Sequence, residues 1–210
     1  MKKIKSALIS VFYKNGLDEI VKELHENGVH LYSTGGTQAF IESLDIPVTP
    51  VEDLTEYPSI LGGRVKTLHP KIFGGILNRR GLAEDQQTIE EYNIPALDLV
   101  IVDLYPFEEV VASGASHKDI IEKVDIGGIS LIRAAAKNYA DVLVISSTNQ
   151  YNKFLNDLQT GGCKFDEDQR KEYAKESFQI SSHYDTSIYN YFSGGYDDAL
   201  KISSTQQRSL

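Results

Sequence analysis

The sequence contains almost no cysteine, and this scarcity limits the chemistry that can be assigned to it. Cys163 is the one cysteine among 210 residues, so the chain cannot form an internal disulfide. A reducing compartment, the cytoplasm, is therefore the expected location. Cys163 also lacks the Cys and His neighbours of a metal site, and we expect it to lie in a surface loop without a function.

Long hydrophobic runs are missing as well. The opening segment MKKIKSALISVF has the basic start of a signal peptide, but its apolar run is short and Lys14 interrupts it. No cleavage site of small residues follows. No segment approaches the roughly 20 apolar residues that span a membrane. We therefore expect no membrane partner.

Positive charge is in short supply too. The chain carries 21 Lys and Arg against 30 Asp and Glu, which gives a formal net charge of -9. This balance argues against nucleic acid as a partner, because general binding of phosphates needs a basic face. An anionic small molecule is still possible where the few cations gather in one cleft.

The composition and the hydrophobic pattern of the sequence favour one globular α/β domain. Hydrophobic residues make up 41% and charged residues 24% of the chain, enough for a core. The run LDLVIVDL (97–104) is typical of a buried strand in a parallel sheet. Apolar residues at 17, 20, 21 and 24 have helical spacing, and Gly28 is placed to end that helix. Strands that alternate with helices predict a mostly parallel central sheet flanked by helices.

The remaining elements follow from the same patterns. Strands are expected at 4–11, 29–33, 46–51, 97–104 and 141–146. Further helices are expected at 38–44, 84–93, 107–112, 116–123, 127–138, 148–160 and 167–192. TGGT (34–37) is expected to form a turn whose Thr37 caps the next helix. The glycine-rich stretch 61–77 suits neither a helix nor a strand, and 194–210 resembles a polar linker after a domain at 1–193.

Polar clusters follow the first two strands, at the edge where ligands of parallel sheets bind. Ser10 and Lys14 precede a helix, and a hydroxyl, a cation and a helix N-terminus together suit a phosphate. The alternative is a strand end with a solvated lysine. In 34–37, two glycines allow successive N–H groups to form an anion-binding concavity, and the alternative is a plain tight turn.

Three further clusters carry candidate chemistry. Arg64 and Lys66 lie in the glycine-rich stretch, where they could bind phosphate or carboxylate or form a solvated basic loop. Asp103 and Tyr105 end a buried strand, and the tyrosine could act as a general acid or base or simply pack in the core. The segment DIGGISLIRAAAKN (125–138) places small side chains between two cations four residues apart, which suits a ligand or a tightly packed helix.

Four of these segments, STGGT, GGRVKTLHPKIFGGIL, LYPF and VDIGGISLIRAAAKN, resemble one known family. The family is the inosine monophosphate (IMP) cyclohydrolase domain, the N-terminal half of a bifunctional purine-biosynthesis protein that also carries AICAR formyltransferase. The resemblance covers roughly residues 4–200. It implies a methylglyoxal-synthase-like fold with extra C-terminal helices, and a homodimer. It also implies that the formyltransferase half is absent from this chain.

The resemblance implies a ring closure on a phosphorylated small molecule. The carboxamide nitrogen of formyl-AICAR ribotide attacks the formyl carbon, and water leaves to give IMP, with no metal or cofactor. An amide nitrogen is a poor nucleophile, so the reaction needs a base, and the formyl oxygen needs an acid and a stabilising charge. Carried over, Lys137 is the proton donor or acceptor, and Lys66, Tyr105 and Asp125 complete the catalytic set. We expect Lys66 to stabilise a phenolate-like Tyr105.

The substrate-binding residues carried over lie in five short segments. They are Ser10, Phe12, Tyr13, Lys14, Thr34, Gly35, Gly36, Thr37, Arg64, Val65, Thr67, Val102, Asp103, Ile126 and Gly127. Four positions depart from the family pattern. SVFYKNG replaces SVSDKTG at Phe12 and Tyr13, Asp103 stands in place of Asn, and Phe73 stands where His is common. These changes leave the catalytic set intact, so activity is expected.

Two other functions fit parts of the pattern. Methylglyoxal-synthase-like domains also serve as allosteric nucleotide sensors, but such a module does not need Tyr105, Asp125 and Lys137 together. Methylglyoxal synthase itself would need an Asp and His arrangement, and only His69 among the five histidines lies in a candidate segment.

Overall fold

The central sheet has five parallel strands in the order β4-β3-β2-β5-β6. The computed structural model describes residues 1–194, so the linker predicted at 194–210 lies outside them apart from Gly194. The strands are β2 (Ser6–Val11), β3 (His30–Ser33), β4 (Thr49–Pro50), β5 (Leu99–Asp103) and β6 (Leu143–Ile145). A separate antiparallel pair joins β1 (Lys2–Lys3) to β7 (Lys164–Phe165). The predicted fold class is confirmed.

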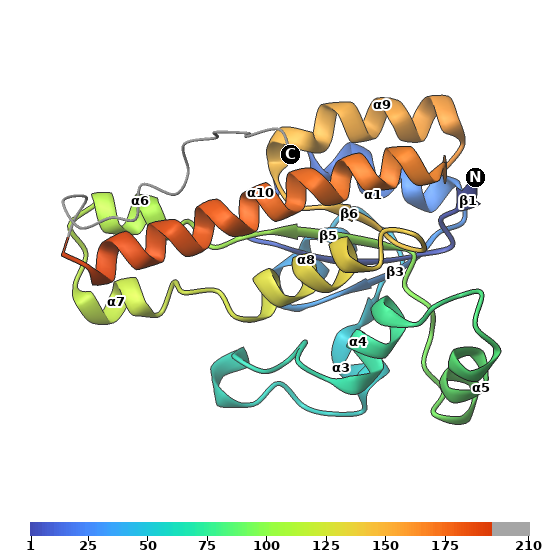
Figure 1. Cartoon of the computed structure of the whole chain (residues 1–210), viewed down its shortest axis with the longest axis horizontal. Helices are drawn as coiled ribbons and strands as arrows, with labels where there is room; N and C mark the ends of the chain where they lie inside the picture. Colours follow the sequence, from blue (N-terminus) through green and yellow to red (C-terminus); the bar gives the residue numbers. More distant parts are fainter. Residues whose placement is uncertain (195–210) are drawn as a thin grey trace, which may run out of the picture.

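Helices cover both faces of the sheet (Figure 1). They are α1 (Leu17–Glu26), α2 (Gly35–Glu42), α3 (Val51–Thr55), α4 (Pro70–Leu77), α5 (Ala83–Glu91), α6 (Phe107–Ala112), α7 (His117–Ile121), α8 (Gly127–Lys137), α9 (Tyr151–Gly161) and α10 (Glu167–Phe192). Side chains alternate along each strand, so Ile9 packs under α1 and α9, whereas Leu8 packs under α4 and α8. Burial on both faces explains the continuous apolar run of β5.

The long helix α10 packs against α8 and the edge strand β6, and it extends beyond the sheet to α6 and α7 (Figure 1). Asp166 begins it with a capping box, because its carboxylate accepts the Gln169 N–H and the Gln169 side chain accepts the Asp166 N–H. At the far end, Tyr184 of α10 packs with Phe107 and Ile120 in a third apolar cluster. Among residues 1–194, none of the helices is apolar enough over a sufficient length to cross a membrane.

Two predictions about local structure are wrong. The segment 34–37 is not a turn before a helix, because α2 already begins at Gly35 with Thr34 as its N-cap. The predicted cap Thr37 instead fastens α2 to β2, where its hydroxyl donates to the Val11 carbonyl at 3.0 Å and accepts the Val11 N–H at 3.1 Å. The stretch 61–77 contains the helix α4, because His69 caps the Lys71 N–H and Pro70 occupies the first helical position.

Two other expectations fail for reasons of packing. The strand predicted at 46–51 is reduced to Thr49–Pro50, since Val51 already begins α3. Cys163 is not on the surface but is fully buried beside β7, among residues of the α1 and α9 face. Burial raises the pKa of the Cys163 thiol to about 11. The pairing of β7 with β1, which sequence patterns did not predict, draws this segment inward.

Candidate active site

A cavity of about 980 Å³ opens where the carboxyl ends of β2, β3 and β5 meet. The loop 61–67 and the connection 121–126 between α7 and α8 form its other walls. Predicted site residues that line it are Ser10, Phe12, Lys14, Thr34, Gly36, Thr37, Arg64, Lys66, Thr67, Asp103, Tyr105, Asp125, Ile126 and Gly127. The structure thus brings together side chains that are more than 100 residues apart in the sequence.

Five predicted residues are not part of the cavity wall. Gly35 is the first residue of α2, and Val102 is buried in the core under α4 and α8. Tyr13 turns its hydroxyl to Glu109 at 2.8 Å, and Val65 is half-buried in the loop. Lys137 is exposed at the last residue of α8, roughly 15 Å along the helix axis from Gly127.

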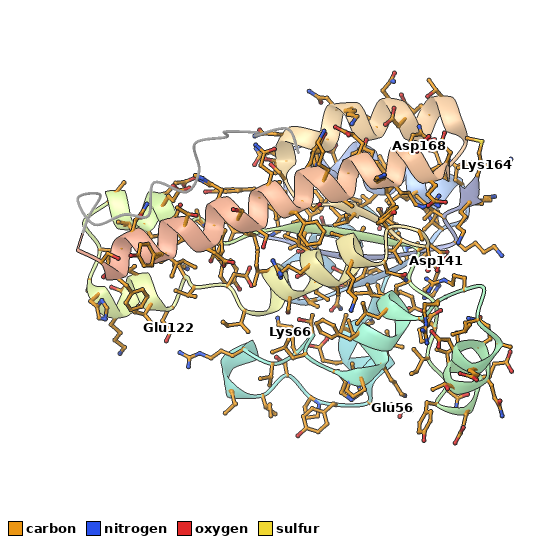
Figure 2. All side chains as sticks on the ribbon, in the orientation of Figure 1. Glu56, Lys66, Glu122, Asp141, Lys164 and Asp168 are labelled. Carbon is orange, nitrogen blue, oxygen red and sulfur yellow. The ribbon has the colours of Figure 1, made fainter. Side chains whose placement is uncertain are left out.

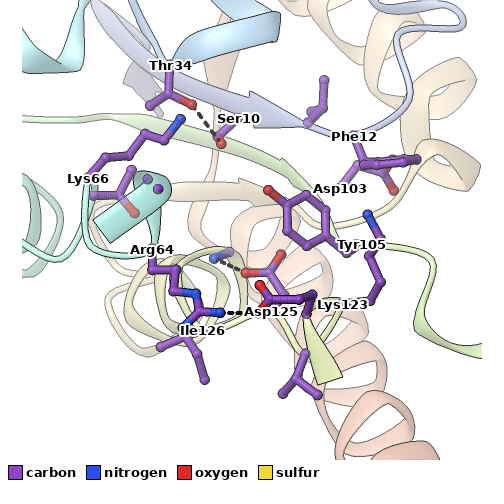
Figure 3. Close-up of a pocket in the computed structure, with 18 of the residues that line it drawn as sticks. Ser10, Phe12, Thr34, Arg64, Lys66, Asp103, Tyr105, Lys123, Asp125 and Ile126 are labelled. Atoms are coloured by element: carbon purple, nitrogen blue, oxygen red, sulfur yellow. Dashed lines mark hydrogen bonds and ion pairs between the residues drawn. The ribbon is translucent and has the colours of Figure 1, made fainter. Parts of the chain in front are cut away.

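One end of the cavity is built from hydroxyls, lysines and the N-terminus of α2. The Ser10 and Thr34 hydroxyls lie 3.3 Å apart beside that terminus (Figure 3). The Lys66 amine points toward them, and a methyl group added at Gly35 would lie only 3.1 Å from it. Lys14 donates to the carbonyls of Val11 and Phe12, and burial lowers the pKa of its ammonium. These groups together suit a phosphate.

The opposite end carries a carboxylate held by backbone. Asp125 Oδ1 accepts the Gly128 N–H at 2.7 Å, at the first turn of α8. Burial raises the pKa of the Asp125 carboxyl, while hydrogen bonds from the backbone of Gly128, Tyr105 and Ile129 oppose that shift. Asp125 is therefore a fixed carboxylate with a raised affinity for a proton, as a general base requires.

Lys123 is a functional candidate that the sequence reasoning missed. Its ammonium lies 5.5 Å from the ring centroid of Tyr105 and 5.8 Å from that of Phe12. The two rings meet edge to face at 5.5 Å (Figure 3). Such distances are within the range of cation–π attraction. In the sequence Lys123 stands two residues before Asp125, just outside the motif that begins at Val124.

An ion pair joins two walls of the cavity. The Arg64 guanidinium contacts the Glu122 carboxylate, which joins the loop 61–67 to the α7–α8 connection. Figure 2 shows Glu122 far from Asp141, which lies just before β6 at the amino end of the sheet. Within residues 1–194, no three His, Cys, Asp or Glu side chains are placed to hold a metal ion.

The comparisons with known proteins fit this geometry. Residues 16–130 match the model of the MGS-like domain, and residues 135–210 match that of the AICARFT/IMPCHase bienzyme. Because the first match covers more than half of the chain, the protein belongs to the family of MGS-like domains. A crystal structure of ForH has the same fold with a TM-score of 0.76 and 32% identity, over 90% of this chain and 99% of that one.

Within that family, the chain matches the N-terminal part of bifunctional purine biosynthesis proteins called PurH. It is 61% identical to the PurH of Bacteroides thetaiotaomicron over 209 residues, which is 100% of this chain and 41% of the relative. It is 46% identical to a PurH of Listeria monocytogenes over 98% of this chain and 41% of the relative. The chain thus spans about two fifths of the length of these relatives.

The two glycines that begin α8 lead to a first prediction. A Cβ at Gly128 would lie 2.6 Å from Asp125 Oδ2, so Gly128→Ala must displace the carboxylate. We expect this variant to lose about 1–3 kcal/mol of unfolding free energy, as overpacking does, in urea denaturation. Gly161→Ala in α9 is the matched control, because a Cβ there meets open space. The control should be unchanged or up to about 1 kcal/mol more stable, and equal losses in both variants would contradict the argument.

The carboxylate of Asp103 leads to a second prediction. Burial raises its pKa, although the Tyr13 N–H at 3.0 Å and the charge of Lys14 oppose the shift. A raised folded-state pKa means that stability falls as pH rises from the ordinary value of about 3.9 through the folded value. The side-chain amide in Asp103→Asn can still accept the Tyr13 N–H but cannot ionise. The stability of this variant relative to wild type should therefore increase with pH and level off near neutrality.

Urea midpoints measured between about pH 3.5 and pH 7 test this expectation. Asp85→Asn is a control whose relative stability should change with pH in the opposite direction, because hydrogen bonds from Arg79 lower the pKa of Asp85 to about 2. A lowered folded-state pKa stabilises the fold above the ordinary value and loses that stability as pH falls. Asp85→Asn should therefore be less stable than wild type at neutral pH and approach it in acid. A stability difference for Asp103→Asn that does not vary with pH would refute the assignment.

Proposed function

We propose that this chain is an IMP cyclohydrolase that closes the purine ring of formyl-AICAR ribotide to give IMP and water. One observation carries the proposal: a single cavity joins a phosphate-binding end to an end that holds Tyr105, Asp125 and a cation. The similarity to PurH proteins supports the same reaction, because their name assigns them to purine biosynthesis.

The substrate phosphate is proposed to bind at the α2 end. The N–H group of Gly36 belongs to the first turn of α2, whose dipole favours a negative charge. Ser10, Thr34, Lys14 and Lys66 add hydroxyl and ammonium donors. This arrangement directs the base of the nucleotide toward Tyr105 and Asp125. Holding the two reacting groups in contact supplies much of the rate enhancement.

Ring closure then proceeds in two steps, addition of the nitrogen to the formyl carbon and loss of water. The carboxamide nitrogen forms a bond to the formyl carbon and loses one proton, which the Asp125 carboxylate is placed to accept. The formyl oxygen gains negative charge and takes up one proton, in place of the one that the carboxamide nitrogen lost, to become a hydroxyl. The C–O bond then breaks, and the hydroxyl leaves as water with a second proton, which comes from the nitrogen that carried the formyl group. Tyr105 lies at this end of the cavity with the Lys123 ammonium 5.5 Å from its ring centroid, and the tyrosine hydroxyl and the positive charge can stabilise that oxygen.

Lys66 and Lys137 require separate assignments. In this structure Lys66 faces the phosphate end, so its predicted role beside Tyr105 stays a prediction, and Lys123 occupies that place. Lys137 lies outside the cavity of its own chain. We keep it as proton donor or acceptor, and its position then requires a homodimer in which a second copy brings Lys137 to the opening.

We also propose that the enzyme acts in the cytoplasm on a phosphorylated small molecule, without nucleic acid, metal or cofactor. In the whole protein, AICAR formyltransferase activity would belong to a second half. A domain at 1–193 followed by a linker at 194–210 fits that organisation.

A direct assay tests the function. The purified chain is mixed with formyl-AICAR ribotide without folate, and the ultraviolet absorbance of IMP is followed. Wild type should turn over, and Asp125→Asn should lose roughly 10²- to 10⁴-fold in kcat because it removes the general base. Asp168→Asn, an exposed carboxylate on α10, is the control and should keep full activity. Saturable IMP binding by wild type without turnover would support a nucleotide-binding module instead.

Mixed dimers test the assignment of Lys137. Lys137→Ala and Asp125→Asn should each be inactive when purified alone. A heterodimer of the two variants has one site with both residues intact if Lys137 acts in the partner's cavity. Co-expression should therefore restore roughly a quarter of wild-type turnover, because half of the dimers are mixed and each contains one complete site. No recovery, or full activity of Lys137→Ala alone, would exclude this role.

A further inference from the structure

The hydroxyl of Tyr184 is bound to the backbone of the cavity wall. It accepts the N–H of Asp125 at 2.7 Å and donates to the carbonyl of Lys123 at 2.9 Å. Tyr184 belongs to α10 and is 59–61 residues away from its two partners in the sequence. One oxygen atom therefore joins α10 to residues 123–125. This segment carries Lys123 and Asp125, which together with Tyr105 form the reactive end of the cavity.

The environment of Tyr184 fixes the position of that oxygen. Only 7% of the residue is exposed, and its ring meets that of Phe107 edge to face with centroids 6.2 Å apart. Burial raises the pKa of the Tyr184 hydroxyl to about 12, so it keeps its proton and can donate at neutral pH. A buried, packed tyrosine with both hydrogen-bonding functions used is a rigid support.

The bridged segment, residues 123–125, carries two groups of the cavity wall. Asp125 is held at one side by Tyr184 through its N–H and at the other by Gly128 through its carboxylate. Lys123 is held through its carbonyl, and its side chain extends over the rings of Tyr105 and Phe12. A shift of residues 123–125 would therefore move the base and the cation together, while the phosphate end on α2 would keep its shape.

We propose that Tyr184 is a positioning residue for catalysis, which sets Asp125 and Lys123 relative to Tyr105 through its two hydrogen bonds. This inference rests on the proposed function. Tyr184 itself does not line the cavity, so it acts through the residues it holds. Since small displacements of reacting groups cost large factors in rate, the effect belongs in kcat rather than in substrate affinity.

The test compares two substitutions on the same helix. Tyr184→Phe removes the bridging oxygen and keeps the packed ring. Tyr173→Phe is the matched control, because Tyr173 is also buried in α10 and its hydroxyl donates to Asp157 at 2.8 Å, outside the cavity. Both variants lose one buried hydroxyl, so comparable falls in the urea midpoint are expected.

Kinetics of IMP formation then separate positioning from stability. Tyr184→Phe should lower kcat roughly 10- to 100-fold. Its KM should stay within about threefold of wild type, because the phosphate end is untouched. Tyr173→Phe should retain the wild-type kcat. Equal kcat in the two variants, with wild type active, would overturn the inference. Absence of turnover in wild type would instead refute the proposed function.

Two further measurements address the bridge itself. Amide hydrogen exchange at Asp125 should be slow in wild type and in Tyr173→Phe, and faster in Tyr184→Phe, because only that variant loses the acceptor. Lys123→Met should also lower kcat, and the double variant with Tyr184→Phe should lose less than the product of the single effects. Unchanged exchange at Asp125, or strictly multiplicative losses, would contradict a role through this segment.

Discussion

The cavity depends on the parallel register of three neighbouring strands. β2 pairs with β3 so that Ile9 lies opposite Ser33, and with β5 so that Val11 lies opposite Asp103. Because all three strands run the same way, the residues that follow them emerge at one edge. The polar groups at the ends of β2 and β3 line one end of the cavity, and Tyr105 after β5 lines the other. A slip of one residue would turn these side chains to the wrong face.

The two ends of the cavity are built by different physical means. At the α2 end, strand ends and a helix N-terminus provide donors that suit a dianion in any nucleotide. At the α8 end, close backbone contacts set one carboxylate, since a Cβ at Gly127 would lie 2.9 Å from the Thr67 hydroxyl and one at Gly128 would reach Asp125. Here glycine is needed for close approach rather than for an unusual φ. In the proposed function, the α2 end would therefore provide affinity for the substrate, while the α8 end would set the geometry of the reaction.

Sequence patterns predicted most of the fold because its signals are local. The buried run of β5 and the spacing of α1 each report burial of one element, and both elements are where the patterns place them. The exceptions arise where two local signals compete or where the partner of a strand is distant in the sequence. In 61–77 the glycines outweighed the His69 and Pro70 start signal, and Cys163 is buried beside a strand pair that joins residues 2–3 to residues 164–165. Short elements of this kind leave no periodicity to detect.

The candidate site was predictable only where a motif marks it. Arg64, Tyr105 and Asp125 stand in motifs of the resembled family, and the cavity contains all three. Lys123 stands outside those motifs, and its importance comes from the rings that its amine faces. The same holds for Phe12, which departs from the family pattern and yet packs against Tyr105. Residue contacts of this type arise from tertiary packing, which composition and spacing do not encode.

The helix α10 explains why this MGS-like domain needs its C-terminal extension. The match to the MGS-like model ends at residue 130, and α10 lies in the part that matches the bienzyme model. Its N-terminal half covers α8 and β6, which buries the edge of the sheet. Its C-terminal half packs on α6 and α7, where Phe107 and Ile120 would otherwise be exposed. These contacts fix the α7–α8 connection, so the extension that stabilises the fold also gives the reactive end of the cavity a rigid wall.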